Sequence, residues 1–308
     1  MARKLRFIPI SPSPTLVFVT CRAIQGRYLF RPGPQFNDLF LGILGHVQQL
    51  YQTPLCGVCV LSSHFHLLLV VNDACQLARF MRDLKSKLAR EVNRLTGWRG
   101  PVFDRRYEMA VVTNEEKAQV ERLLYILSNG CKEGLVEGPQ DWPGVHCVSA
   151  LLDGKPLKGH WFDRSREYAA RSQRKNFKRL RYATEETVVI SPIPCWAHLS
   201  PKLFRSRVAS LMDSIAAAAA QARSQTGRSI EGVKSILTRN PQYRPAQLAR
   251  SPAPLVHAAT KRARKAFYDM YSWFVAAFRS AAEMLKRGDL KAPFPSGSFP
   301  PGLPFVAG

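Results

Sequence analysis

Two histidines stand two residues apart in an otherwise apolar run. The segment VCVLSSHFHLLLVV, residues 58–71, is apolar enough to form a central β-strand, yet it contains His64 and His66. Alternate residues of a strand share a face, so both imidazoles project to one side and Phe65 to the other. Two adjacent imidazoles can share a metal ion, and burying them without a partner is costly. Alternatively, each imidazole hydrogen-bonds to a neighbouring carbonyl or carboxylate.

A second polar group follows one line along a predicted helix. The pattern TNEE, residues 113–116, matches a capping box and predicts a helix that runs to about Asn129 or Cys131. Glu121, Tyr125 and Asn129 lie at i, i+4 and i+8, off its apolar stripe. Asn129 can therefore add a metal ligand, and Tyr125 can place its oxygen near whatever the metal holds. The alternative is a half-buried tyrosine above an asparagine that caps the helix.

The elements that must position these residues alternate in type along the chain. Period-2 and period-3.6 patterns predict strands over residues 15–24, 55–61, 65–71 and 107–112, with helices over 36–51 and 76–96 and the tyrosine helix last. This β-α-β-β-α-β-α order predicts an α+β fold. We expect a ferredoxin-like (RRM-like) antiparallel sheet with helices on one face, plus the helix that carries Tyr125.

The character of the sequence changes near residue 150. Residues 164–181 are densely basic, residues 201–225 and 257–287 have helical patterns, and the end of the chain is proline-rich. We therefore expect a catalytic domain over residues 1–150. A basic, mostly helical extension with a Pro-rich tail would follow over residues 151–308.

Composition narrows the class of partner. The 308 residues carry a formal net charge of +23, which favours a polyanion, with nucleic acid the strongest candidate. Seven cysteines are an odd number and predict a reducing cytosol rather than a disulfide framework. Cys56 and Cys59 have C-x-x-C spacing, but in a strand-like run we expect them to pack as small hydrophobes. No segment has the roughly 20 uncharged apolar residues of a membrane span.

Basic residues near the predicted strands and helices are candidates for DNA contacts, although for each residue alone a solvated charge is the favoured explanation. They lie on the second helix, beside the last strand and in the basic cluster of the extension: Arg79, Arg82, Lys85, Arg90, Arg94, Arg105, Arg106, Arg174, Lys175, Lys178 and Arg179.

Three motifs together resemble a known family. SHFHLLL is similar to the histidine-hydrophobe-histidine (HUH) motif, GPVFDRRYE to the stretch before the last strand, and LLYILSNGCKEGLVEGPQDWPG to the tyrosine helix and its exit in REP-associated tyrosine transposases. These are relatives of the single-tyrosine insertion-sequence transposases. The resemblance covers about residues 14–150, and the order and spacing of three motifs make it more specific than H-x-H alone.

The resemblance implies roles for four residues. His64, His66 and Asn129 would bind a divalent cation, Mg²⁺ or Mn²⁺, and Tyr125 would be the nucleophile. The chain has Ser62-Ser63 where the family commonly has Pro-Asn. After Asn129 it has Gly-Cys-Lys-Glu-Gly where the family commonly has Pro-Val-Arg-Ala-Gly, which predicts a looser helix end at Asn129.

The expected function is that of a metal-dependent DNA transposase or endonuclease. It would cleave and rejoin single-stranded or hairpin DNA through a 5′-phosphotyrosine, as a monomer or homodimer in the bacterial cytoplasm, associated with the nucleoid. Two alternatives stay open. One is a nucleic-acid-binding protein on the same scaffold that does not cleave, and the other is a replication-initiator or relaxase nuclease with the same motif.

Overall fold

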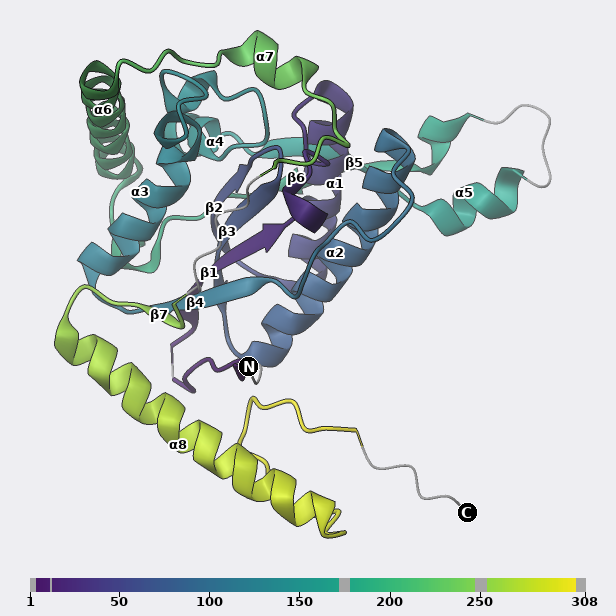
Figure 1. Cartoon of the computed structure of the whole chain (residues 1–308), viewed down its shortest axis with the longest axis vertical. Coiled ribbons are helices and arrows are strands. Elements are labelled where there is room, and N and C mark those ends of the chain that lie inside the picture. The colour runs from purple at the N-terminus through teal and green to yellow at the C-terminus, as the bar shows by residue number, and fades with distance from the viewer. Residues whose placement is uncertain (1–3, 12, 172–177, 247–253, 303–308) are drawn as a thin grey trace.

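The computed structural model describes residues 4–11, 13–171, 178–246 and 254–302. The first half contains β1 (Thr15–Arg22), α1 (Pro34–Tyr51), β2 (Leu55–Val60), β3 (His64–Val71), α2 (Ala74–Thr96), β4 (Glu108–Val112) and α3 (Glu116–Lys132). The second half contains α4 (Val148–Asp153), β5 (Leu157–Phe162), α5 (Arg164–Arg171), β6 (Ala183–Val188), α6 (Pro201–Thr226), α7 (Val233–Thr238), β7 (Val256–His257) and α8 (Lys261–Lys286) (Figure 1).

The main sheet has five strands in the order β2-β3-β1-β4-β7. β3 pairs antiparallel with both β1 and β2, and β4 pairs antiparallel with β1. Only β7, from the far end of the chain, is parallel to its neighbour. The α+β class and the β-α-β-β-α-β-α order expected from the sequence are therefore confirmed over the first half.

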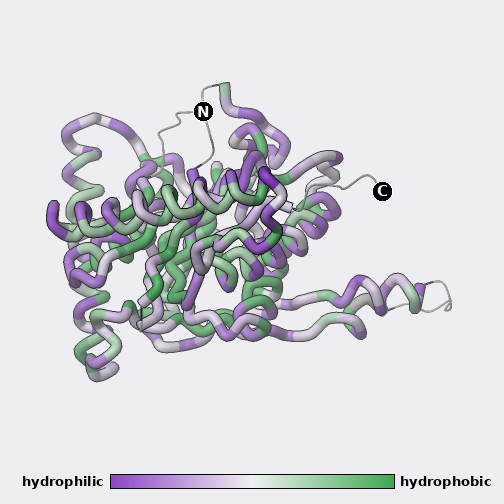
Figure 2. The backbone as a smooth tube through the Cα atoms, turned by 90° about the horizontal axis from the view of Figure 1, so that it is seen from below, coloured by the Kyte–Doolittle hydropathy of each residue, from purple (hydrophilic) through white to green (hydrophobic). Residues whose placement is uncertain are grey.

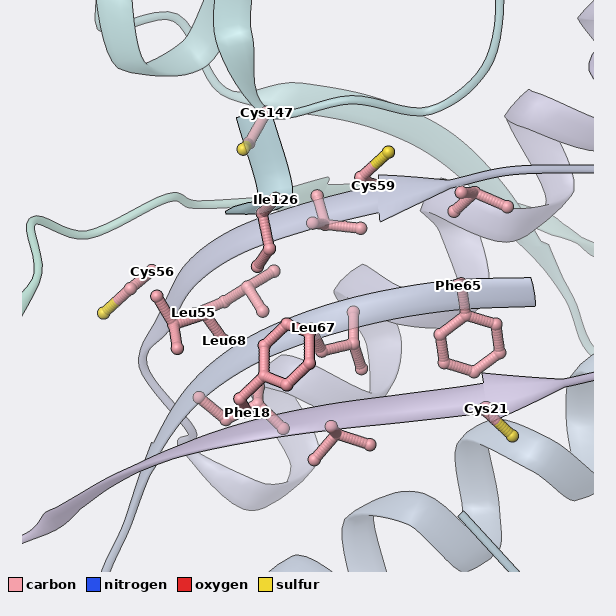
Figure 3. Packing of buried hydrophobic residues seen from close by; sticks show 14 of the residues in the cluster. Phe18, Cys21, Leu55, Cys56, Cys59, Phe65, Leu67, Leu68, Ile126 and Cys147 are labelled. Atoms are coloured by element: carbon pink, nitrogen blue, oxygen red, sulfur yellow. The ribbon is translucent and has the colours of Figure 1, made fainter. Parts of the chain in front are cut away.

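Successive residues of β3 point to opposite faces of the sheet. The Phe65 ring lies 5.5 Å from that of Phe40 in α1, whereas the His66 ring lies 5.4 Å from that of Tyr125 in α3. α2 lies on the α1 side, where the hydroxyl of Tyr51 donates to Asp83. α1 and α2 therefore cover one face and α3 the other (Figure 1). In Figure 3, Ile126 of α3 reaches over β2 toward Leu68.

Local sequence accounts for the boundaries of α2. Asp73 accepts a hydrogen bond from the Gln76 amide as N-cap, and Gly97 ends the helix in the left-handed region with φ of 68°. The capping box predicted for α3 is wrong. Its N-cap is Glu115, while the Thr113 hydroxyl donates to the Glu115 carboxylate instead of capping the helix.

The second half of the chain packs against the first at several places. β5 and β6 form a hairpin that rests on α1, and α6 packs along α3. The arm that contains α5 is mostly hydrophilic, whereas hydrophobic residues concentrate in the central strands (Figure 2). No helix of the described residues is long and apolar enough to cross a membrane.

Gly42 lets β5 approach the α1 backbone. A Cβ atom at Gly42 would lie 2.1 Å from the carbonyl carbon of His160, so any side chain must push the hairpin away. We expect Gly42→Ala to lower the free energy of unfolding by about 2 to 3 kcal/mol, measured by denaturant unfolding. Gly33→Ala is the matched control, because a Cβ there meets nothing within 4 Å. Equal stability of the two variants would contradict this close contact.

β7 and α8 attach to the β4 edge partly through one carboxylate. Glu115 accepts hydrogen bonds from the Thr113 hydroxyl and the Ala259 amide, at 2.7 and 2.8 Å. Hydrogen bonds lower the pKa of Glu115 to about 2, and the bond from the Thr260 hydroxyl has the largest effect. A carboxyl whose pKa is depressed on folding stabilises the fold above its ordinary pKa of 4.5, and this contribution is lost as pH falls toward 2.

We therefore expect the docking of the β7 segment and α8 to weaken in wild-type protein as the pH falls from 4.5 toward 2. In Glu115→Gln the docking is weaker at neutral pH and loses this acid dependence. Pepsin cleavage within residues 256–286, followed by mass spectrometry, measures the release. The control is Glu116→Gln, because that neighbouring carboxylate bonds to Trp196 and Arg207 rather than to the β7 segment. Identical acid profiles for wild type and Glu115→Gln would refute the role of this carboxylate.

Candidate active site

His64 and His66 lie side by side on the sheet face that α3 covers. Their ring centroids are 4.9 Å apart with the rings nearly perpendicular. His66 is 2% exposed, while His64 is half-buried. The shared face that the H-x-H spacing predicts is therefore confirmed, and it is the face that carries Tyr125.

Each histidine is held through Nδ1. His66 Nδ1 lies 2.9 Å from the Thr20 hydroxyl of β1, and His64 Nδ1 lies 3.0 Å from the Ser63 hydroxyl. Nε2 of His66 is buried and has no hydrogen-bond partner among the described residues. A fixed Nδ1 and an unpartnered Nε2 is the arrangement of histidines that ligate a metal through Nε2.

Both imidazoles are held in the neutral form. Burial, and to a smaller extent the nearby Arg22 charge, lowers the pKa of His64 to about 4. Burial also lowers the pKa of His66 well below its usual value, with the neighbouring His64 as the next cause. Neutral imidazole keeps the lone pair that a cation requires, so both residues are in their ligating form near pH 7.

Tyr125 lies across from the histidines on α3. Its half-buried ring contacts His66 and Phe18 edge-on, with centroid separations of 5.4 and 5.5 Å. Burial raises the pKa of Tyr125, and the Arg122 charge opposes this rise. The phenol is therefore protonated at neutral pH and would need assistance to act as a nucleophile.

Asn129 lies one turn beyond Tyr125 and is 1% exposed. The helix does not loosen there, because α3 continues to Lys132. The expectation of a looser end is wrong for a packing reason. A Cβ at Gly130 would lie 3.0 Å from Val136 and 3.3 Å from Trp142, so glycine lets these side chains close over the helix. Nδ2 of Asn129 is buried without a partner among the described residues.

Two imidazoles alone do not complete a cation site, and the described residues contain no group of three His, Cys, Asp or Glu able to hold a metal ion. A third ligand would have to be an amide. Asn129 offers one on the same α3 face as Tyr125, and a half-turn of its amide exchanges nitrogen for the ligating oxygen. Buried unpartnered atoms on His66 and Asn129 are costly unless they bind something. Mixed imidazole and amide ligation suits Mg²⁺ or Mn²⁺ loosely.

Three cations surround the Tyr125 ring, and sequence reasoning missed all of them. The Arg122 guanidinium carbon and the Lys132 ammonium lie 5.1 and 5.0 Å from its centroid. Arg22 lies on the same β1 face as Thr20, opposite His64 in the strand register, and its charge lowers the pKa of Tyr125. Carboxylates are also near, since Glu108 faces Thr20 and Glu133 raises the pKa of Tyr125. Arg122 sits three residues before Tyr125, a spacing that marks a shared helix face.

The basic residues predicted to contact DNA lie elsewhere. α2 packs against α1, across the sheet from Tyr125, so Arg79, Arg82, Lys85, Arg90 and Arg94 are not brought together with the histidines. Lys85 donates to the carbonyl of Arg105 at 2.8 Å, while Arg105 and Arg106 are exposed before β4. Lys178 is exposed and precedes the return of the chain to β6. Arg174, Lys175 and the side chain of Arg179 lie outside the described residues.

No group of cysteines within the described part of the chain is placed to hold a metal ion. Cys56 and Cys59 are buried in β2, and burial raises the pKa of the Cys56 thiol to about 12. The Cys56 thiol donates to the carbonyl of Pro192. All seven cysteines are free, so the expectation that these two pack as small hydrophobes is confirmed. Figure 3 shows Cys59 and Cys147 among the buried side chains.

Comparison with known proteins finds one family model. Residues 32–129 match the family described as IS200-like transposases. Among curated proteins, none matches the chain. A solved structure of the REP-associated tyrosine transposase bound to a REP hairpin is 16% identical, with 50% of this chain and 86% of that chain covered and a TM-score of 0.41. A proposed transposase from Deinococcus radiodurans R1 is 17% identical, with 41% and 96% covered and a TM-score of 0.28. The family model confirms the resemblance expected from the motifs over residues 32–129, where this chain is similar to the IS200-like transposases.

Proposed function

We propose that this protein is a DNA transposase or endonuclease that cleaves and rejoins single-stranded DNA through Tyr125. The observation that carries the proposal is the convergence of His64, His66 and Tyr125 on one sheet face, within the segment that matches IS200-like transposases. The net charge of +23 supports a polyanionic partner. The finer features, namely the metal, the covalent tyrosine and the single-stranded substrate, are part of the proposal.

Tyr125 and the two cations beside it would have different roles in the reaction. Arg122 and Lys132 flank the ring and would attract a phosphate of the DNA backbone to the phenol. The Tyr125 oxygen then forms a bond to phosphorus while the bond from phosphorus to the 3′-oxygen breaks. The phenol proton passes to water, and the leaving oxygen takes up a proton to become a 3′-hydroxyl. Attack by another 3′-hydroxyl reverses these changes and rejoins the strands.

His64, His66 and Asn129 would hold a divalent cation. When bound, this cation would polarise the scissile phosphate and neutralise charge in the transition state. Thr20 and Ser63 orient the two imidazoles through Nδ1, which leaves Nε2 free to ligate. The basic residues of α2 and of the arm are kept as proposed DNA contacts outside this centre. The boundary near residue 150 and a monomer or homodimer also remain proposals.

The test is covalent capture of DNA. The full chain is incubated with a panel of labelled single-stranded hairpins and matching unstructured strands, with and without Mn²⁺. Hairpins are included because the family resemblance implies them. We expect a protein–DNA adduct on a denaturing gel that requires Mn²⁺, and mass spectrometry of its peptides should place the nucleotide on Tyr125. Binding without an adduct across the panel would reject cleavage and favour the non-cleaving alternative.

A further inference from the structure

A cavity separates α3 from the second half of α6. Its volume is about 570 Å³, within the range of about 300 to 1,000 Å³ that small-molecule sites occupy. α6 packs against α3, and its buried residues Val208, Met212 and Ile215 all lie in the first part of the helix. Beyond Ile215 the α6 residues that line the cavity include Ala218, Ala219 and Ala222, whose small side chains leave space beside α3. Figure 1 shows the two helices side by side.

The cavity has both apolar and cationic lining residues. Leu124, Ile215 and the alanines supply an apolar wall, while Lys132, Arg223 and Arg228 supply three cations against the single carboxylate of Glu133. Nη1 of Arg223 is buried and has no hydrogen-bond partner among the described residues. A buried guanidinium nitrogen without a partner is costly unless an anion or another acceptor reaches it. An apolar wall beside a cationic group suits a ligand with one flat apolar part and one anionic part.

The cavity adjoins the candidate active site. Lys132 lines the cavity, and its ammonium also lies 5.0 Å from the Tyr125 ring centroid. Ser128, another lining residue, donates to the carbonyl of Tyr125. A DNA strand with a phosphate at Tyr125 therefore has a neighbouring nucleotide within reach of the cavity.

We propose that the cavity between α3 and α6 binds one unpaired nucleotide of the DNA strand, with its base against the apolar wall and its phosphate toward Lys132 and Arg223. This inference rests on the proposed function, which supplies the strand. It assigns a role to α6, which lies outside the segment that matches the transposase family. Seating a base in an apolar pocket favours single-stranded DNA, because a paired base must first be unstacked.

The test is the affinity of the full chain for fluorescein-labelled, random-sequence 12-mer DNA, measured by anisotropy beside a 12-mer of the same charge built from abasic nucleotides. Ala219→Trp fills the cavity without changing charge, and Ala217→Trp is its control on the same helix, outside the lining. We expect Ala219→Trp to weaken binding of the ordinary 12-mer about tenfold and to abolish the preference over the abasic strand. Ala217→Trp should change neither by more than about twofold.

Charge is tested separately from space. Arg223→Gln removes a lining cation, and Arg205→Gln removes the same charge from an exposed position of α6. We expect Arg223→Gln to weaken binding at least about threefold more than Arg205→Gln. If Ala219→Trp lowers the melting temperature below that of Ala217→Trp, Ala222→Leu takes its place as a smaller filler.

The outcomes separate this inference from the proposed cleavage. Equal affinities and equal base preferences for Ala219→Trp and Ala217→Trp would overturn the nucleotide site, whether or not Tyr125 forms an adduct. If Ala219→Trp loses the preference for the ordinary 12-mer while Ala217→Trp keeps it, and the wild-type chain forms no adduct, the nucleotide site would be supported and cleavage rejected. Failure of the wild-type chain to bind either 12-mer would overturn both.

Discussion

Replacing Tyr125 by phenylalanine is expected to abolish the covalent protein–DNA adduct and leave DNA affinity within about threefold of wild type. The change removes the phenol oxygen and keeps the ring. The edge contacts with His66 and Phe18 are therefore retained, as is the position between Arg122 and Lys132. Adduct yield on a denaturing gel and anisotropy with the same hairpin measure the two quantities.

Tyr107→Phe is the matched control. Tyr107 precedes β4 and is 8% exposed, and burial raises the pKa of its hydroxyl to about 12. It lies over Arg6 and near Cys21, whose β1 position pairs with Phe65, so it faces away from the histidines. We expect this variant to form the adduct as wild type does. An adduct that survives in Tyr125→Phe and disappears in Tyr107→Phe would move the nucleophile to the other face of the sheet.

Local periodicity was sufficient to place the histidines and the tyrosine. Alternation in β3 fixes His64 and His66 on one face, and the i, i+4 spacing in α3 fixes Tyr125 and Asn129 on another single face. Neither pattern says that the two faces meet. That expectation came from the family resemblance, and the 5.4 Å separation of the His66 and Tyr125 rings confirms it for this pair.

Thr20 and Arg22 could not be predicted because they depend on strand pairing. They belong to the site because β1 pairs with β3 in the register that places Thr20 opposite His66 and Arg22 opposite His64. A shift by one residue would turn both side chains to the other face. The local pattern of residues 15–24 does not specify how these residues align with β3. The same reason hides β7, a two-residue strand that pairs with β4 from more than 140 residues away.

The predicted capping box does not form because the Thr113 hydroxyl bonds to another residue. Thr113 and Glu116 have the spacing of the motif, but Glu115 accepts the Thr113 hydroxyl and also bonds to the Ala259 amide. Thr113, which would otherwise cap the helix, therefore takes part with Glu115 in the contacts that dock the β7 segment. Glu116 instead accepts from the Trp196 indole and Arg207. Local propensity predicted that a helix begins here, and long-range contacts decided which residue caps it.

Replacing His66 by leucine is expected to reduce adduct formation about 100-fold or more and to remove its response to Mn²⁺. Leucine fills a similar volume in this buried position but offers no nitrogen. Adduct yield is measured over a Mn²⁺ titration, and Mn²⁺ bound to the protein is measured independently by electron paramagnetic resonance. Unchanged Mn²⁺ binding in His66→Leu would show that the cation is held elsewhere.

Thr20→Val also tests whether His66 holds the cation, because Thr20 orients the His66 ring. Valine has nearly the shape of threonine, so the change removes chiefly the hydroxyl that lies 2.9 Å from His66 Nδ1. Loss of such an orienting bond typically weakens metal affinity about 10- to 100-fold, and we expect the Mn²⁺ titration to shift upward by that factor while the maximal adduct yield is retained. Thr15→Val, a buried threonine of the same strand that pairs with Val71, should leave the titration unchanged. Because a general loss of stability would affect both threonine variants, a shift confined to Thr20→Val ties the cation to His66.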